Sequence, residues 1–161
     1  MTSVRRQKGI KLSYYLCLTH GVTVRFFHLN NNRQYNWYVV MFINHTNHPS
    51  QYWSDEQLAA AHQYGEVVDI PFPLIDPELP SGEIGQLVQE YAGRIISLNP
   101  QAVLCQGEFI YCHALVERLL AVGITVLAAT SERLVSESYE AGINEKIVNF
   151  QFVQFREYCH L

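Results

Sequence analysis

The chain has 161 residues, of which 48% are apolar, and it carries 11 basic against 15 acidic side chains. This composition suffices for one globular core and is too balanced for a disordered or collagen-like protein. Residues 1–40 hold six basic side chains and no acid, whereas residues 41–161 hold all 15 acids and five bases. The two segments therefore have formal charges of +6 and −10. This asymmetry indicates either a basic arm for an anionic partner or a segment outside the working domain.

Three further classes of protein are not expected from the sequence: a membrane-spanning protein, a secreted protein with a signal peptide, and a disulfide scaffold. No stretch approaches the run of about 18 apolar residues that spans a membrane. The N-terminal apolar stretch is interrupted by Ser13, Thr19 and His20 and lacks the cleavage site of a signal peptide. Four cysteines are few for a disulfide scaffold, and Cys105 and Cys112 lie in apolar segments. We therefore expect a cytoplasmic protein with reduced thiols.

The first predicted elements are a buried strand, a polar loop and a helix. The apolar run over 38–43 predicts the strand, and the polar cluster over 44–50 predicts the loop. Ser54 is a suitable N-cap, and Gln57 occupies the third helical position. Acidic residues occupy the first turn, and Gly65 ends the segment. The sequence thus carries signals for both the start and the end of this helix.

A second strand and a second helix follow. Residues 66–70 read as a strand that Pro71 ends, and more prolines make the next segment a loop. Apolar side chains then recur at three- and four-residue spacing from Ile84 to Leu98. This spacing predicts an amphipathic helix, which Pro100 stops.

The last part of the chain predicts two more apolar strands and a hairpin. A strand over 102–105 precedes a helix that Gly123 ends, and another apolar strand covers 124–129. The runs over 134–138 and 147–155 are separated by a segment that contains Gly142 and Asn144. They predict a terminal antiparallel β-hairpin.

Together these elements predict an α/β fold. Apolar strands separated by helices are typical of a parallel sheet covered on both faces. We therefore expect a Rossmann-like open sheet of four parallel strands with flanking helices, plus a C-terminal antiparallel β-hairpin, in one domain over 38–158. Residues 1–37 supply no helix cap, amphipathic face or needed strand. They are expected to be a poorly ordered basic extension or the product of an upstream start codon, with Met41 as the working start. The alternative is an arm that contacts nucleic-acid phosphates.

A ligand site is expected where the parallel strands end. In open α/β sheets ligands bind at the carboxyl ends of strands, beside the point where strand order reverses. With the second strand outside the first and the third on the other side, three polar clusters converge there: residues 44–50 after the first strand, 106–108 after the third and 130–133 after the fourth. Helix N-termini after the first and third strands would offer N–H groups to an anion. The candidate catalytic residues are His45, His48 and Arg133, and the candidate ligand-binding residues are Asn44, Asn47, Ser50, Trp53, Gln106, Gly107, Glu108, Thr130 and Ser131.

Several nucleotide-binding and metal-binding motifs are absent from the sequence, which limits the kinds of site to be expected. The chain has no G-x-x-x-x-G-K-[ST] and no G-x-G-x-x-G after its first strand, so neither a P-loop nor a dinucleotide cofactor is expected. His45 and His48 lack the helical spacing of a zincin, and no cysteine pair has zinc-ribbon spacing. We expect no metal and no cofactor. The site then consists of amide, hydroxyl and imidazole groups that suit a base, a sugar and proton transfer, with an arginine for a phosphate.

A string of residues along the chain carries a family resemblance. It comprises Asn47-His48-Pro49-Ser50, Trp53-Ser54, Gln57, Ala60-Ala61, Tyr64-Gly65, Asp69-Ile70-Pro71-Phe72-Pro73, Asp76-Pro77, Gln106-Gly107-Glu108-Phe109, Ser131-Glu132-Arg133 and Phe155-Arg156-Glu157-Tyr158. The string resembles small proteins of type III CRISPR loci, the stand-alone CARF-like (CRISPR-associated Rossmann fold) proteins, several lineages of which are ring nucleases. The resemblance covers residues 41–158, and no catalytic residue of that family is carried over with it.

The resemblance implies a cyclic oligoadenylate as ligand, which ring nucleases linearise to switch off antiviral signalling. RNA carries its own nucleophile, the 2′-hydroxyl, so cleavage needs no metal if that group is held in line with phosphorus. Our hypothesis makes His45 or His48 the proton-transfer group and Arg133 a phosphate stabiliser. A symmetric ring is matched most simply by a homodimer with facing clefts. The alternatives are a sensor or sponge that binds without cutting, and an unrelated enzyme that uses Glu108 and Glu132 as acid and base.

Overall fold

The computed structural model describes residues 16–19, 22–28, 35–140 and 143–159. The chain divides into two compact units, 1–40 and 41–161. In the first unit, β1 (Leu16–Thr19), β2 (Val22–His28) and β3 (Tyr35–Val39) form an antiparallel sheet in the order β1-β2-β3. Among the described residues, the strands of this sheet do not pair with strands of the second unit. Residues 1–15, part of the predicted extension, lie outside the described residues.

The second unit contains a mixed five-stranded sheet in the order β5-β4-β6-β7-β8. Its parallel part comprises β4 (Met41–Thr46), β5 (Glu66–Asp69), β6 (Ala102–Gln106) and the start of β7 (Thr125–Glu140). β8 (Ile143–Glu157) is antiparallel to β7. The second strand of this unit therefore lies outside the first and the third lies on the other side, which confirms the predicted order.

The predicted first strand is wrong in its boundaries. The structure ends β3 at Val39 and starts β4 at Met41, so residues 44–46 belong to the strand and not to the loop. The polar side chains of Asn44 and His45 are buried because β4 pairs with a neighbour on both sides and each side chain finds a hydrogen-bonding partner. Polarity alone, which predicted the loop, does not reveal such partners.

The predicted fourth strand and the first hairpin strand are one continuous strand. β7 runs without interruption from Thr125 to Glu140, through the polar residues 130–133 that the sequence suggested as a break. That segment contains no Gly or Pro, and each of its residues pairs with β8 across a bulge at Thr130/Ser131. The predicted hairpin residue Gly142 lies outside the described residues. The fold is thus α/β, and the sheet of the second unit is a mixed sheet of five strands, in which β7 serves both as the fourth strand and as the first strand of the hairpin.

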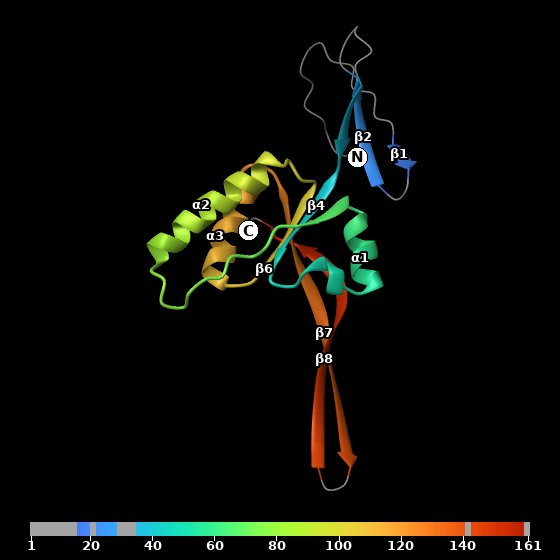
Figure 1. The fold of residues 1–161 in the computed structure, drawn as a ribbon, viewed down its shortest axis with the longest axis vertical. Coiled ribbons are helices and arrows are strands. Elements are labelled where there is room, and N and C mark those ends of the chain that lie inside the picture. The colour runs from blue at the N-terminus through green and yellow to red at the C-terminus, as the bar shows by residue number, and fades with distance from the viewer. Residues whose placement is uncertain (1–15, 20–21, 29–34, 141–142, 160–161) are drawn as a thin grey trace. The chain divides into compact units, whose positions relative to one another are not determined.

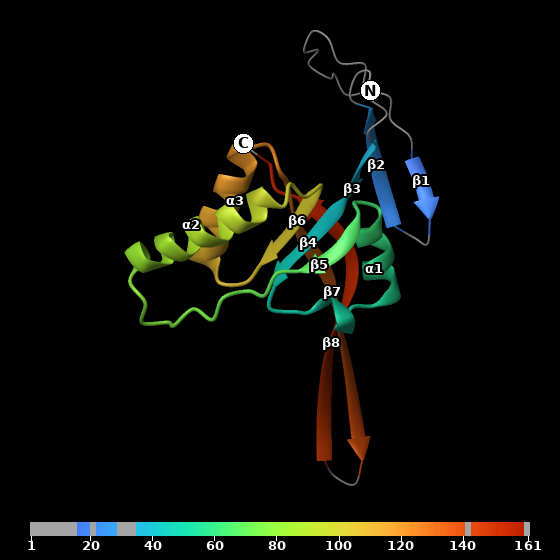
Figure 2. The same cartoon turned by 45° about the horizontal axis from the view of Figure 1, so that its top comes forward.

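Helices cover both faces of this sheet (Figures 1 and 2). α1 (Asp55–His62), preceded by the 3-10 helix η1 (Ser50–Tyr52), packs on one face, where Ala61, Phe42, Leu104 and Leu127 share one core cluster. α2 (Ser81–Ser97) and α3 (Phe109–Ala121) pack together on the other face.

Several predicted helix signals are confirmed. Ser54 accepts a hydrogen bond from the Gln57 amide, as the N-cap prediction requires. Gly123 follows α3 with a φ of 82°, a left-handed conformation that glycine adopts without strain. Among the described residues, no helix combines the length and the apolar character that crossing a bilayer requires.

Candidate functional site

The loop after β4 is held by a network centred on Asp69, the last residue of β5. One Asp69 carboxylate oxygen accepts a hydrogen bond from Asn44 Nδ2 at 2.7 Å. The other accepts one from Ser50 Oγ at 2.9 Å, and the Ser50 amide donates to both oxygens at 3.2 Å. Because Asn44 lies on β4 and Asp69 on its neighbour β5, the network ties the carboxyl ends of two paired strands to the loop between them.

His48 sits on this loop with its backbone fixed and its side chain exposed. Its carbonyl accepts hydrogen bonds from Asn44 Nδ2 at 2.9 Å, Trp53 Nε1 at 3.1 Å and Thr46 Oγ1 at 3.2 Å. Its amide donates to Thr46 Oγ1 at 3.1 Å. The neighbouring Asn47 is also exposed. The imidazole of His48 is therefore accessible to a ligand while its main chain cannot move freely.

His45 lies in a different environment, fully buried on the α2/α3 side of β4. Its Nδ1 is 3.0 Å from the Ile70 carbonyl oxygen and its Nε2 is 2.8 Å from the Tyr111 hydroxyl. A carbonyl can only accept, so Nδ1 carries the proton of the neutral ring and Nε2 accepts from Tyr111. The rings of Phe72, Tyr91 and Tyr111 surround the imidazole at centroid distances of 5.1–5.8 Å.

Burial is the main cause that lowers the pKa of His45, and the charge of Arg94 adds to it, while the Ile70 hydrogen bond acts in the opposite direction. Burial also raises the pKa of Tyr111, which keeps its hydroxyl protonated as a donor. Both ring nitrogens of His45 are occupied. Of the two histidines predicted to transfer protons, only His48 reaches solvent.

The Phe72 ring packs between His45 and the backbone of Gly107. A Cβ placed on Gly107 would overlap the Phe72 ring, so this ring lies directly against the glycine backbone. The same ring makes an edge contact with Tyr111 at a centroid distance of 5.1 Å. Gly107 is thus needed for the close approach of the segment that follows β5, because any side chain at this position would overlap the Phe72 ring.

The polar side chains predicted to bind a ligand after β6, those of residues 106 and 108, form hydrogen bonds to the backbone of the protein. The Glu108 carboxylate accepts hydrogen bonds from the amides of Ile110 at 3.1 Å and Tyr111 at 2.7 Å, so it caps α3. These two amides of the α3 N-terminus therefore already have a carboxylate as their acceptor. Gln106 makes two hydrogen bonds to the backbone of Ala129 and joins β6 to β7.

The predicted cluster after the fourth strand lies on the extended part of β7. Thr130 donates its hydroxyl hydrogen bond to the Gln154 carbonyl at 3.1 Å. Ser131 follows the bulge, and Arg133 is exposed opposite Phe150 of β8. In the described part of the chain, no side-chain hydrogen bond joins this cluster or Glu108 to the loop after β4, and no group of three or more His, Cys, Asp or Glu is placed to hold a metal ion.

The predicted cysteine packing is confirmed, since Cys105 and Cys112 are free and buried. The hydrogen bond with Cys112, together with burial, raises the pKa of the Cys105 thiol. Sequence reasoning missed the central role of Asp69 and Tyr111. The available signal for Asp69 was an acid as the last residue of an apolar strand, at the edge where ligands bind. Nothing in the sequence indicates the contact of Tyr111 with His45, because the two residues come from separate elements.

Comparison with known proteins gives one family. The model described as the Uncharacterized protein MJ1673 family matches residues 40–156. The match covers most of the chain, and the protein belongs to this family. Curated proteins and solved structures give no match.

Proposed function

We propose that this MJ1673-family protein binds a cyclic oligoadenylate of a type III CRISPR antiviral system and linearises it, with His48 as the proton-transfer residue. Two things support the proposal: the resemblance of residues 41–158 to CARF-like ring nucleases, and the geometry of His48. That geometry carries the proposal, because an exposed imidazole stands on a loop fixed by hydrogen bonds at both its amide and its carbonyl. In this proposal the protein is a cytoplasmic phosphodiesterase with a Rossmann-like domain.

The reaction requires one base and one acid. His48 accepts the proton of a ligand 2′-hydroxyl as the 2′-oxygen forms a bond to phosphorus and the P–O5′ bond breaks. The imidazolium then returns the proton to the leaving 5′-oxygen, so atoms and charge balance without a metal ion. A fixed loop favours this chemistry because rate depends on holding the attacking group in line.

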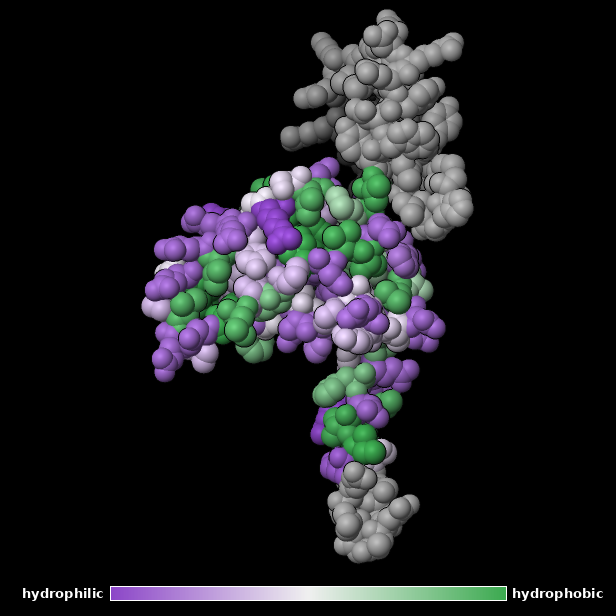
Figure 3. All heavy atoms as spheres, viewed as in Figure 1, coloured by the Kyte–Doolittle hydropathy of each residue, from purple (hydrophilic) through white to green (hydrophobic). Residues whose placement is uncertain are grey.

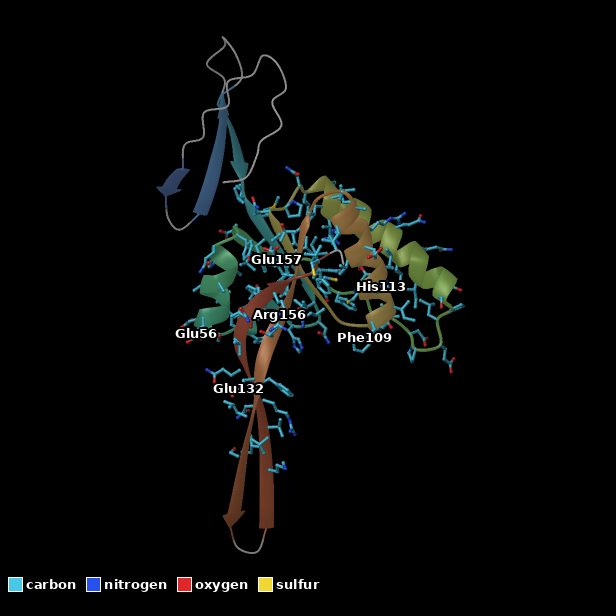
Figure 4. The ribbon with its side chains drawn as sticks, turned by 180° about the vertical axis from the view of Figure 1, so that it is seen from behind. Glu56, Phe109, His113, Glu132, Arg156 and Glu157 are labelled. Carbon is cyan, nitrogen blue, oxygen red and sulfur yellow. The ribbon has the colours of Figure 1, made fainter. Side chains whose placement is uncertain are left out.

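Two exposed residues that follow strands of the parallel sheet are suited to bind the ligand. The Asn47 side chain is exposed and offers both a donor and an acceptor to a base or a ribose. Phe109, the first residue of α3, is 89% exposed (Figure 4) and presents an aromatic face on which an adenine can stack. Both follow strands of the parallel sheet at their carboxyl ends. The phosphate-stabilising role of Arg133 stays a prediction.

A second function, binding without cleavage, is favoured by the position of Glu108. Stabilising the charge that develops on the phosphoryl oxygens needs donors aimed at them, and two first-turn amides of α3, those of Ile110 and Tyr111, are occupied by the Glu108 carboxylate. A protein with an ordered ligand-binding loop and few free donors acts as a sensor or sponge. The third possibility, acid and base work by Glu108 and Glu132, has less support because both Glu108 oxygens are engaged.

The test is incubation with cyclic tri-, tetra- and hexa-adenylate in EDTA, with products separated by chromatography and binding measured by calorimetry. The key variant is His48→Ala. His62→Ala is the matched control, because His62 is also exposed but lies in the last turn of α1. We expect His48→Ala to lower the cleavage rate by roughly a hundredfold to ten-thousandfold, the usual contribution of an acid–base group.

Each outcome selects one reading. Cleavage by the natural protein and by His62→Ala, with loss in His48→Ala, supports the assignment. Cleavage that survives His48→Ala overturns the role of this histidine. Binding without cleavage selects the sensor, and the absence of both binding and cleavage rejects a cyclic oligoadenylate as ligand.

A further inference from the structure

Cys105 and Cys112 form a pair of thiols on the α2/α3 side of the sheet. Cys105 is the last residue but one of β6, and Cys112 lies in the first turn of α3. Only Gly107 and Glu108 separate these two elements in the chain. The two thiols are hydrogen-bonded to each other. The proposed cleavage reaction uses neither sulfur.

Apolar packing encloses the pair. Both cysteines belong to the core cluster between the sheet and helices α2 and α3, together with Leu115 and Val116 of α3. Many hydrophilic side chains lie on the outer surface of α2 (Figure 3), whereas the residues that α2 buries are apolar. In the part of the chain that the structure describes, no third His, Cys, Asp or Glu joins the two thiols in a group that could hold a metal ion. The chemistry that two adjacent thiols support on their own is a disulfide.

The two thiols differ in their access to solvent. Cys105 is completely buried, whereas Cys112 is 7% exposed. The hydrogen bond with Cys105 lowers the pKa of the Cys112 thiol, while burial and the charge of Glu108 act in the opposite direction. The thiolate is the reactive form of cysteine. A small oxidant therefore meets Cys112 first, and Cys105 lies beside it as the thiol that completes the disulfide.

We propose that Cys105 and Cys112 are a site of reversible oxidation, at which a hydroperoxide converts the two thiols to a disulfide. In the first step the Cys112 thiolate attacks a peroxide oxygen. An S–O bond forms, the O–O bond breaks, and the leaving oxygen takes the proton that the Cys112 thiol gave up. In the second step the Cys105 sulfur attacks the Cys112 sulfur. The S–S bond forms, the S–O bond breaks, and hydroxide leaves with the Cys105 proton as water.

The electrons of this reaction balance without any further reactant. The pair of thiols is oxidised to one disulfide, and the hydroperoxide is reduced to water and an alcohol, or to water alone when it is hydrogen peroxide. A dithiol such as dithiothreitol returns the disulfide to the thiols by exchange. The modification is therefore reversible by a chemical class different from the one that causes it.

The disulfide has an expected consequence at the carboxyl edge of the sheet. An S–S bond is about 2.05 Å long, which is shorter than the distance between hydrogen-bonded sulfur atoms, so the start of α3 must move towards β6. Tyr111 precedes Cys112 in α3 and is hydrogen-bonded to His45. His45 is also the register partner of Cys105 on the neighbouring strand β4. We therefore expect oxidation to change the surroundings of the His45 imidazole.

The first test uses the full chain, hydrogen peroxide and peptide mapping by mass spectrometry after alkylation of the denatured protein. We expect a disulfide between Cys105 and Cys112, with loss of both alkylation sites and their recovery in dithiothreitol. Cys159→Ala is the matched control, because Cys159 is free and exposed, and this variant should form the same disulfide. Cys105→Ala should not form it, and its Cys112 should proceed to the sulfinic acid, which dithiothreitol does not reverse.

The second test follows the histidine imidazoles by nuclear magnetic resonance. Peroxide should shift the His45 signal of the natural protein, and dithiothreitol should restore it. The signal of His62 is the internal control, because His62 lies on α1 at the other face of the sheet. In Cys112→Ala the pair is absent, so the His45 signal should stay in place.

Different results overturn different parts of the proposal. Full alkylation of Cys105 and Cys112 after peroxide, or disulfides formed only through Cys159, overturns the oxidation site. A disulfide that leaves the His45 signal unmoved overturns the link to the sheet edge. If Cys105→Ala fails to fold by circular dichroism, Cys112→Ala replaces it, with the same expected loss of the disulfide. These measurements need no nucleotide, so their failure is distinct from failure of the proposed nuclease or sensor function.

Discussion

The carboxyl edge of the five-stranded sheet has two layers, and His45 and His48 belong one to each. In the inner layer, His45 is enclosed by aromatic rings and has both nitrogens hydrogen-bonded. In the outer layer, only the backbone of His48 is bonded, and its imidazole meets solvent. Two residues of one type, three positions apart, thus have opposite exposure because β4 ends between them. We infer that the inner layer stabilises the fold and that a reactive side chain at this edge must belong to the outer layer.

The largest loss of stability is expected from a substitution in the inner layer. His45→Ala removes a buried ring and leaves the Tyr111 hydroxyl and the Ile70 carbonyl without their partner, which costs about 3 kcal/mol of unfolding free energy. His48→Ala should change stability by less than about 0.5 kcal/mol, as exposed side chains do. Urea unfolding of the two variants measures the contrast, and equal losses would contradict the division into layers.

The contact between Phe72 and Gly107 is the next point to test. Gly107→Ala forces the Phe72 ring to move, and overpacking of this kind costs about 2 kcal/mol. The matched control is Gly93→Ala in α2, where an added Cβ meets nothing within 4 Å. It should stabilise the protein by about 0.5–1 kcal/mol, because alanine favours helix. The comparison fails if both substitutions shift the urea midpoint in the same direction.

A smaller effect is expected from the cap of α3. Glu108→Ala removes the acceptor of two amides, and the loss of a side-chain cap costs about 1 kcal/mol. Thermal unfolding followed by circular dichroism measures it. An unchanged melting temperature would show that the carboxylate contributes nothing to the helix.

The smallest effect is a dependence on pH. The pKa of His45 is lower in the fold than its usual value of 6.5, so the unfolded chain binds the proton more readily. The stability due to neutral His45 is therefore complete above pH 6.5 and declines as the pH falls from 6.5 towards the folded pKa. His45→Asn should show a weaker decline over this window in urea titrations. An identical decline in both proteins would contradict the assignment.

Sequence periodicity predicted most of the α/β unit, because strands and helices with one buried face repeat their apolar residues regularly. It located α2, whereas the strand order was predicted from the order that is commonest in short α/β units, and the N-cap at Ser54 from its residue type. It misplaced the end of β4, where Asn44 and His45 are polar and yet buried. Their partners Asp69 and Tyr111 come from other elements, and a pattern along the chain does not contain pairings across it.

The candidate site was harder to predict than the fold. Topology placed residues 44–50 and 106–108 at the carboxyl ends of β4 and β6, but residues 130–133 are part of the continuous strand β7. It also did not distinguish residues that meet solvent from residues that hold the backbone in place. Gln106, Glu108 and Thr130 were expected to bind a ligand, and each forms hydrogen bonds to the backbone of the protein itself. Polar side chains near strand ends can form hydrogen bonds to the backbone of the protein as readily as to a ligand.

The hairpin of β7 and β8 also has a consequence for the order of folding. Its rows near Glu140 and Ile143 join residues close in sequence, whereas Phe42 of β4 must find Ala102 of β6 across the length of two helices. Loop-closure entropy makes the local pairing the faster step. When the complete chain refolds, the hairpin can thus form while the parallel strands are still unpaired, and its exposed apolar side chains are then uncovered before the rest of the sheet has formed. Refolding at high concentration should therefore be limited by aggregation through this hairpin, and slow dilution should raise the yield.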